Sequence, residues 1–294
     1  MRLLVTGALG MLGHDVMRAG DRAGHELVGV DLPELDISEV SAVSALVARL
    51  QDEPGSLHGI VNCAAWTDVD GAESRREQAH AVNVEGASVL AGVALEGEIP
   101  LLHISTDYVF DGVAPLDREG RPRPYLESDP TGPRSVYGAT KLEGEEVVLG
   151  VSRENTVVRT AWLYGLDGGN FVDTMLRLAG ERDSVQVVTD QVGSPTWSGH
   201  LAPALVGLLE RRVTGLVHLT GGGHISWNGF AKEIFRQAEI DCRVEPTTSD
   251  QFVRPAPRPA WSALESERDD VLPLPPWQDG LAGYLAARAG MMRA

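Results

Sequence analysis

A tyrosine and a lysine four residues apart stand in a helical stretch near the middle of the chain. Tyr137 and Lys141 lie in the predicted helix 134–149, where the i, i+4 spacing puts both side chains on one face. A free tyrosine has a pKa of about 10, and a nearby ammonium favours its phenolate, so the pair could pass a proton to a carbonyl oxygen. Ser105 and Thr106 end the apolar run that starts at residue 100, and a hydroxyl there could hydrogen-bond the same oxygen. Together with Tyr137 and Lys141, this strand end predicts the catalytic set of a carbonyl reductase.

Glycines recur at every third position in TGALGMLG, directly after the first apolar run of the chain. The first glycine permits a tight turn, the second lets a pyrophosphate approach the backbone, and the third lets a helix pack closely on the sheet. The free N–H groups and the dipole of that helix N-terminus then favour a phosphate group. The segment therefore predicts a dinucleotide site, with contacts from Gly7, Gly10, Met11, Leu12 and Gly13.

An aspartate, Asp31, ends the second apolar run, where an acid can accept hydrogen bonds from ribose hydroxyls. No Lys or Arg occurs between Asp31 and Arg49 to neutralise a 2′-phosphate, so the sequence favours NADH and leaves NADPH open. Asp36 and Ile37 lie where an acid and an aliphatic side chain could meet the adenine. Asp36 could equally begin a helix.

Two cysteines, Cys63 and Cys242, are too few for a disulfide scaffold, a four-cysteine zinc site or an iron–sulfur site. Cys63 is followed by Ala64 and Ala65 at the end of a third apolar run, and these small residues leave room for a cofactor. We interpret Cys63 as a small buried side chain and not as a nucleophile. The eight histidines show no metal-ligand spacing, and we predict no metal site.

Short apolar runs alternate with helical stretches in the first half of the chain. Runs typical of buried parallel strands cover residues 2–6, 26–30, 59–62, 100–105, 156–160 and 184–188. Helical periodicity covers residues 11–23, 39–51, 72–95 and 134–149. This alternation predicts an α/β fold built on a Rossmann-type, doubly wound parallel sheet.

The pattern becomes irregular after residue 165, where helical stretches alternate with Gly-rich and Pro-rich loops. We predict an NAD(P)-binding domain over residues 1–165 and a smaller, mainly substrate-binding lobe over residues 166–294. The lobe is expected to be partly interleaved, because a strand near 184–190 or 216–219 would return to the sheet. The long polar segment 111–134 is either a lid or a plain surface excursion. The acidic run 143–146 is most simply a solvated helix end.

Several segments of the chain resemble the extended short-chain dehydrogenase/reductases and, among them, the dTDP-4-dehydrorhamnose reductase family. The resemblance runs from residue 1 to about residue 264. The resemblance rests on the segments TGALGMLG, NCAAWTDVDGAE, VNVEG, STDYVFDG, VYGATKLEGE, VVRTAWLYG, DQVGSPT and RPAWSAL. STDYVFDG and RTAWLYG together are specific to this branch.

The resemblance implies roles for individual residues. Thr106, Tyr137 and Lys141 would be catalytic, and Lys141 would also hold the nicotinamide ribose and depress the pKa of Tyr137. Trp162 would stack on the hexose ring, and Arg258 is a candidate for the diphosphate by bidentate pairing. The implied substrate contacts are Thr67, Val69, Thr106, Asp107, Tyr108, Tyr137, Trp162 and Arg258.

The chain departs from the family pattern at three places. Trp261 stands where the branch usually has a smaller or polar residue. Some members bind magnesium through glutamates at a dimer interface, but Asp15 and the pair Gly199-His200 occupy those regions here. Thr106 is followed by Asp107-Tyr108 and not by the Asp-Glu pair of sugar-nucleotide dehydratases, which leaves dehydration without its acid and base.

The chain is strongly acidic. Its 294 residues carry 42 acidic and 25 basic side chains, a formal net charge of −17. Such a charge disfavours nucleic acid and anionic bilayers as partners. No signal peptide or membrane-length apolar run is recognisable, so we expect a cytoplasmic protein that is a monomer or homodimer.

The function that the resemblance implies is NAD(P)H-dependent reduction of the C4 keto group of dTDP-4-dehydro-L-rhamnose to dTDP-L-rhamnose. A reductase of another 4-keto-deoxysugar nucleotide would carry the same catalytic residues and stays an open alternative. A non-catalytic regulatory subunit of the same fold is less favoured, because Thr106, Tyr137 and Lys141 are all present.

Overall fold

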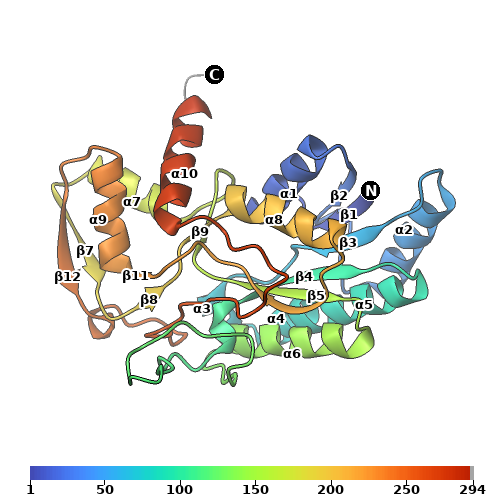
Figure 1. Cartoon of the computed structure of the whole chain (residues 1–294), viewed down its shortest axis with the longest axis horizontal. Helices are drawn as coiled ribbons and strands as arrows, with labels where there is room; N and C mark the ends of the chain where they lie inside the picture. The colour runs from blue at the N-terminus through green and yellow to red at the C-terminus, as the bar shows by residue number, and fades with distance from the viewer. Residues whose placement is uncertain (292–294) are drawn as a thin grey trace.

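The central sheet consists of six parallel strands in the order β10-β5-β4-β3-β1-β2 (Figure 1). The computed structural model describes residues 1–291, so the last three residues of the predicted C-terminal lobe, 292–294, lie outside the described part. The six strands are β1 (Arg2–Thr6), β2 (Glu26–Val30), β3 (Gly59–Asn62), β4 (Leu101–Thr106), β5 (Thr156–Thr160) and β10 (Gly215–His218). The α/β class and the doubly wound parallel sheet are confirmed.

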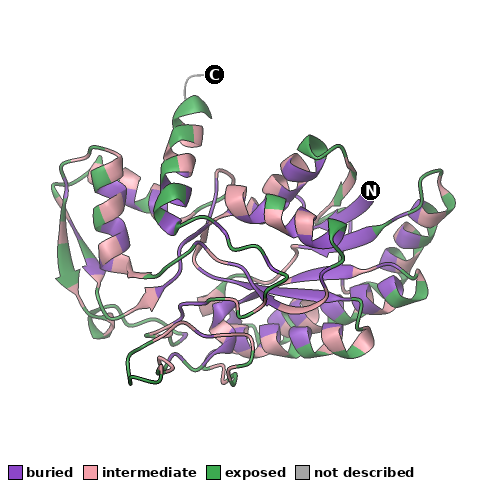
Figure 2. Cartoon of the chain, in the orientation of Figure 1, coloured by how far each residue is buried: buried purple, intermediate pink, exposed green. Residues whose placement is uncertain are grey.

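Helices cover both faces of this sheet because successive strand residues point to opposite sides. Leu3 and Val5 of β1 pack under α1 (Met11–Arg22) and α8 (Ser198–Glu210). Leu4 points the other way, into the core beneath α2 (Val40–Asp52), α5 (Ala87–Glu96) and α6 (Val136–Val151). The strands are buried along most of their length (Figure 2).

The segment expected as one helix over 72–95 is interrupted. It consists of α3 (Val69–Ser74), α4 (Arg76–His80), a π-helical turn (Ala81–Gly86) and α5. Arg75 leaves the helical region, with φ −126° and ψ 48°, and separates α3 from α4. Apolar periodicity alone could not show these breaks.

A second group of elements lies beside the sheet, at the left of Figure 1, around its own aromatic core. Its members are α7 (Phe171–Ala179), α9 (Trp227–Gln237), α10 (Trp277–Met291) and the parallel pair β7 (Ser184–Val188) and β12 (Arg243–Thr247). Short pairs complete it: β6 (Leu163–Tyr164) with β9 (Thr196–Trp197), and β8 (Val192–Gly193) with β11 (Ile225–Ser226). Of the two segments considered for a returning strand, residues 215–218 join the central sheet and 184–188 do not.

Candidate functional site

The glycine turn lies between β1 and α1, where the strand order of the sheet reverses. Gly7 has φ +69°, and a Cβ there would lie 2.5 Å from the backbone nitrogen of Ala64. A Cβ on Gly13 would lie 2.0 Å from the Gly7 carbonyl oxygen. Only glycine fits either position. The first turn of α1 starts at Gly10 without a side-chain cap, so its N–H groups are available to an anion.

Asp31 lies directly over this turn. One carboxylate oxygen accepts a hydrogen bond from the Leu9 N–H at 2.9 Å, and the other accepts from the Leu32 N–H at 2.8 Å. Asp36 instead accepts from the N–H and the hydroxyl of Ser38, and Ile37 is buried in the core. Asp31 is therefore fixed beside the glycine turn, whereas Asp36 serves a local turn.

The small residues after β3 adjoin the same turn. The backbone of Cys63 and Ala64 packs against Gly7, and Ala65 follows, half-buried. Burial raises the pKa of the Cys63 thiol to about 12, so the thiolate is not formed at neutral pH.

The candidate catalytic side chains converge at the carboxyl end of β4. Thr106 ends that strand, and Tyr137 and Lys141 come from the first turns of α6. The Ser135 hydroxyl caps α6 by accepting from the Gly138 N–H at 3.1 Å. The Thr106 side chain lies close enough to Tyr137 to oppose the effect of burial on its pKa. The structure thus brings together the three residues that the sequence selected.

The electrostatics of the pair differ from the expectation. Burial raises the pKa of Tyr137 to about 12, and the nearby Asp107 carboxylate acts in the same direction. Lys141 Nζ lies 2.6 Å from the Ile104 carbonyl oxygen and 3.1 Å from His103 Nε2. Burial also lowers the pKa of Lys141 to about 8. The Tyr137 pKa is thus raised in the free protein, and the role of Lys141 in lowering it stays a prediction.

Asp107 and Tyr108 also lie next to Tyr137. The rings of Tyr108 and Tyr137 meet edge to face, with centroids 5.5 Å apart. Asp107 is buried and receives a hydrogen bond from the Thr106 hydroxyl at 3.1 Å, while its Oδ2 has no partner. Burial raises the pKa of Asp107 to about 6.

Arg258 is held by a carboxylate of the protein itself. Both of its terminal nitrogens donate to Asp70, at 2.9 Å each, and Arg254 lies 3.4 Å from the same carboxylate. Asp70 belongs to α3, which starts at Val69, and Thr67 is exposed just before it. The bidentate geometry expected for a diphosphate is thus present, with Asp70 as the anion.

Trp162 stacks face to face on Trp227, with ring centroids 3.4 Å apart and planes within 2°. Its backbone is left-handed, with φ +46°, which a bulky residue rarely adopts. One face of the indole that was expected to meet a hexose is therefore covered by Trp227.

Three buried polar residues near the site were not selected from the sequence. Asn83, in the π-helical turn, accepts from the Trp66 N–H and donates to Thr140 of α6. His103 contacts Lys141, and Glu145, which is 2% exposed, pairs with the buried Arg159 at 2.7 Å. The acidic run 143–146 is therefore not solvated throughout. The segments VNVEG and VYGATKLEGE, which carry the family resemblance, contain Asn83 and Glu145 and were the available signals for these two residues.

The long segment 111–134 is tied to the C-terminal part of the chain. The Trp261 indole N–H donates to the Arg123 carbonyl oxygen at 3.0 Å, and Tyr125 forms an isolated parallel bridge with Leu264. Trp261, the residue that departs from the family pattern, thus anchors this loop.

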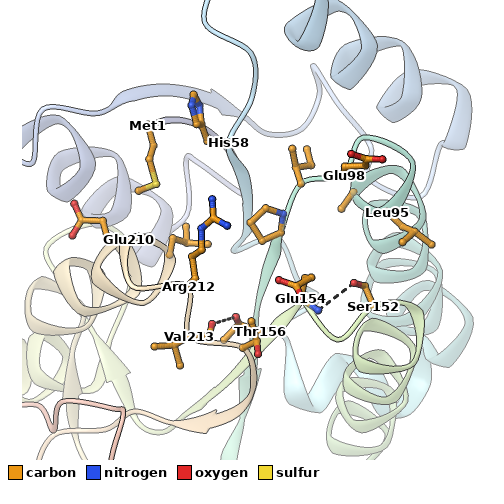
Figure 3. A pocket seen from close by; sticks show the side chains of 15 residues that line it. Met1, His58, Leu95, Glu98, Ser152, Glu154, Thr156, Glu210, Arg212 and Val213 are labelled. Carbon is orange, nitrogen blue, oxygen red and sulfur yellow. Dashed lines mark hydrogen bonds between the residues drawn. The ribbon is translucent and has the colours of Figure 1, made fainter.

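A cavity of about 660 Å³ opens at the opposite, amino edge of the sheet (Figure 3). Met1, His58, Glu98, Glu210 and Arg212 are among the residues that line it. None of the candidate catalytic side chains reaches it, and parallel sheets bind ligands at the carboxyl edge. Within residues 1–291, no cluster of three or more potential ligands is arranged to hold a metal ion. No helix in the same range is long and apolar enough to cross a membrane.

A glycine turn at the switch point of a parallel sheet, with Thr106 at the end of a nearby strand and Tyr137 and Lys141 on α6, is the arrangement of a short-chain dehydrogenase/reductase. A family model described as "RmlD substrate binding domain" matches residues 1–289. The chain belongs to this family, that of the dTDP-4-dehydrorhamnose reductases.

The relatives cover nearly the whole chain. A dTDP-4-dehydrorhamnose reductase of Streptomyces griseus is 43% identical, over 98% of this chain and 94% of its own. A probable dTDP-4,6-dihydroxy-2-methyloxan-3-one 4-ketoreductase of Streptomyces antibioticus is 41% identical, over 96% and 93%. The solved dTDP-4-dehydrorhamnose reductase of Bacillus anthracis, in complex with NADP, superposes with a TM-score of 0.90, at 35% identity over 97% of this chain and 99% of that one.

Proposed function

We propose that this protein reduces the C4 keto group of dTDP-4-dehydro-L-rhamnose to give dTDP-L-rhamnose. The observation that carries the proposal is that Thr106 at the end of β4 and Tyr137 and Lys141 of α6 lie at the same edge of the sheet as the glycine turn, in a chain of this family. Curated relatives 42–43% identical carry the name dTDP-4-dehydrorhamnose reductase.

The residues around the glycine turn fit a nicotinamide dinucleotide. Gly7, Gly10 and Gly13 leave a cradle that a side chain would fill, and Asp31 is oriented by the Leu9 N–H. Met11, Leu12, Cys63, Ala64 and Ala65 complete the proposed contacts. When bound, a reduced nicotinamide supplies the hydride that the reduction consumes. Asp31 argues that NADH is at least accepted, while the Bacillus anthracis relative binds NADP.

The three proposed catalytic residues have different roles, and the role of Tyr137 follows from its protonation state. Tyr137, whose pKa is raised, keeps its proton at neutral pH and can donate it to the C4 oxygen. Thr106 orients the carbonyl through its hydroxyl. Lys141 is proposed to hold the nicotinamide ribose.

The sugar nucleotide is proposed to lie between Tyr108, Thr67, Val69 and Trp162, with Asp107 beneath it. Arg258 is the proposed diphosphate contact, and it would then exchange Asp70 for the substrate. The cytoplasmic location and the monomeric or dimeric state stay predictions.

A second substrate has support from the relatives. The Streptomyces antibioticus relative is named as a 4-ketoreductase of a different dTDP-sugar, and a Streptomyces niveus relative as a dTDP-4-keto-6-deoxy-D-glucose reductase. Another 4-keto-deoxysugar nucleotide is therefore the alternative substrate of the same site.

An assay with a panel of substrates distinguishes the proposed substrate from another 4-keto sugar nucleotide and from a non-catalytic role. The purified protein is mixed with NADH or NADPH and each of several dTDP-4-keto sugars, and the loss of reduced nicotinamide absorbance is followed. We expect the fastest loss with dTDP-4-dehydro-L-rhamnose; a faster rate with another sugar supports the alternative. No loss with any of them would refute the reductase and favour a regulatory subunit.

A further inference from the structure

Glu145 is a buried carboxylate on the same face of α6 as the two candidate catalytic side chains of that helix. Tyr137, Lys141 and Glu145 are spaced four residues apart, so each lies one turn from the next on one side of the helix. Lys141 and Glu145 are each 2% exposed. The two side chains are therefore neighbours in the interior, where water screens their charges little.

Two strands of the central sheet hold the Glu145 carboxylate in place. The Arg159 guanidinium donates to it from Nε at 2.9 Å and from Nη2 at 2.7 Å, and the Ser105 hydroxyl donates to Oε1. Ser105 and Arg159 are register partners on β4 and β5. Ser105 also directly precedes Thr106, so the carboxylate is fixed next to the strand end that carries the candidate catalytic threonine.

Lys141 has no negative charge among its hydrogen-bond partners. Its Nζ donates to the Ile104 carbonyl oxygen at 2.6 Å and lies 3.1 Å from His103 Nε2. Burial lowers the pKa of Lys141 to about 8, and the Glu145 carboxylate acts in the opposite direction. A pKa of about 8 leaves this side chain mostly an ammonium at neutral pH, although burial disfavours its charge.

We propose that Glu145 is a positioning residue that keeps Lys141 an ammonium inside the protein. Arg159 and Ser105 hold the carboxylate one helical turn from Lys141, where it supplies the negative charge that the hydrogen-bond partners of Lys141 lack. The ion pair of Glu145 with Arg159 then has a role besides stability. Buried ion pairs can often be replaced by apolar side chains without loss of stability.

The other ionisable groups around Lys141 do not provide this charge. Cys63, after β3, is a neutral thiol, and His103 on β4 is uncharged because burial and the Lys141 charge both lower its pKa. The Asp107 carboxyl, after β4, acts instead on Tyr137. Charged residues elsewhere on α6 and on the neighbouring α3, α4 and π-helical turn are at least partly exposed, among them Glu73, His80, Glu85, Glu143 and Glu146.

The consequence for the cofactor rests on the proposed function. Lys141 is proposed to hold the nicotinamide ribose, and an ammonium has three N–H donors and no acceptor. One donor is directed at the Ile104 carbonyl oxygen, which leaves donors for ribose hydroxyl oxygens. Glu145 acts on cofactor binding through Lys141 and does not itself touch the cofactor.

The protonation of Lys141 can be measured directly because Lys141 and Lys232 are the only lysines of the chain. Protein labelled with lysine carrying ¹³C at Cε gives two resonances, and Lys232→Arg assigns them. Lys232 is exposed and should titrate near its ordinary pKa of about 10.4. We expect the Lys141 midpoint near pH 8 in the native chain and about one pH unit or more lower in Glu145→Gln. An unchanged or higher midpoint in Glu145→Gln would overturn the proposal.

Glu146→Gln is the matched control, because it removes the same charge from the next, exposed position of α6. The Lys141 midpoint should stay at its native value in this variant. A fall as large as that in Glu145→Gln would mean that the overall charge of the helix sets the protonation of Lys141, and the proposal would be wrong.

A double variant provides the test if Glu145→Gln, which leaves Arg159 buried and unpaired, does not fold. Glu145→Met combined with Arg159→Met removes both charges and leaves an apolar pair in their place. The Lys141 midpoint should fall here too, since the carboxylate is absent; a native midpoint would refute the role of Glu145.

These titrations need neither cofactor nor turnover. A lowered midpoint in a protein that reduces no sugar nucleotide would therefore refute the proposed function alone. An unchanged midpoint in an active reductase would refute the role of Glu145 alone.

Discussion

Burial pushes the ionisable side chains of the site towards their neutral forms. The pKa values of Tyr137 and Asp107 are raised to about 12 and about 6, and that of Lys141 is lowered to about 8. All three shifts have desolvation as their largest cause, because each side chain leaves water for the interior. Shifts of this size are typical of functional sites, and the raised pKa keeps Tyr137, the proposed proton donor, protonated at neutral pH.

Asp31 provides a prediction about the cofactor. Asp31→Ala should raise the ratio of kcat/KM for NADPH to that for NADH by about tenfold, since it removes a carboxylate that would repel a 2′-phosphate. Steady-state kinetics with both cofactors measure the ratio. Glu34→Ala removes an exposed charge from the same loop and should leave the ratio unchanged. An unchanged ratio in Asp31→Ala would count against its placement at the ribose.

Residue types and spacing were enough to select Gly7, Asp31, Thr106, Tyr137 and Lys141, because each belongs to a local motif. They could not show that Arg258 is paired with Asp70, or that Glu145 is buried against Arg159. Those contacts join residues from distant elements, and the acidic run around Glu145 has the pattern of a solvated helix end. The protonation states also depend on burial, which the sequence does not state.

The catalytic geometry depends on how closely α6 approaches the end of β4. Gly138 follows Tyr137 on this helix, and a Cβ there would lie 2.2 Å from the backbone oxygen of Tyr108. A Cβ on Gly150, near the other end of α6, would have no other atom within 4 Å. One helix therefore offers a glycine that positions the site and one that does not.

These two glycines give a matched pair of variants. Gly138→Ala should lower the free energy of unfolding by about 1–3 kcal/mol, because the helix must shift, and it should reduce kcat by moving Tyr137. Gly150→Ala should instead stabilise the protein by about 0.5–1 kcal/mol, since alanine is the better helix former. Urea unfolding and the reductase assay measure both effects. A Gly138→Ala variant with native stability and rate would show that the close approach is unimportant.

The strongly periodic elements of the sheet were predictable from the sequence, and the later ones were not. The strand β12 contains Pro246 and few apolar residues, and α10 has apolar and small residues on all sides, so neither shows clear periodicity. The strand at 184–188 was recognised, but its partner could not be, because β12 lies far along the chain. Long-range pairing therefore decided which strand returned to the central sheet.

At the scale of the whole molecule, the chain crosses repeatedly between the sheet and the aromatic second group. His218, at the end of β10, lies where these crossings meet. Its Nδ1 is 3.2 Å from the Tyr125 carbonyl oxygen and 3.0 Å from that of Glu265, and Arg159 approaches its Nε2. Burial lowers the pKa of His218 to about 4.

This histidine should make stability depend on pH. A group that is neutral when folded and has a depressed pKa stabilises fully above its unfolded pKa, about 6.5, and loses that contribution as the pH falls towards about 4. We expect the native chain to lose about 3 kcal/mol relative to His218→Gln over this range. Chemical denaturation at several pH values tests this. Parallel pH profiles of the two proteins would contradict it.

The formal charge of −17 does not oppose the binding of two anionic ligands, because the groups proposed to hold them are local. The glycine turn offers backbone N–H groups, and Arg258 offers a guanidinium that already holds a carboxylate. Most of the remaining acidic side chains are exposed or half-buried.

The most direct test of the account compares the native protein with Tyr137→Phe in reduction of dTDP-4-dehydro-L-rhamnose, with cofactor affinity measured in parallel. Removing the phenolic hydroxyl takes away the proton donor and little else, so kcat should fall by about 10²–10⁴-fold while the Kd for the cofactor stays nearly the same. A Tyr137→Phe variant that turns over at the native rate would contradict the central claim.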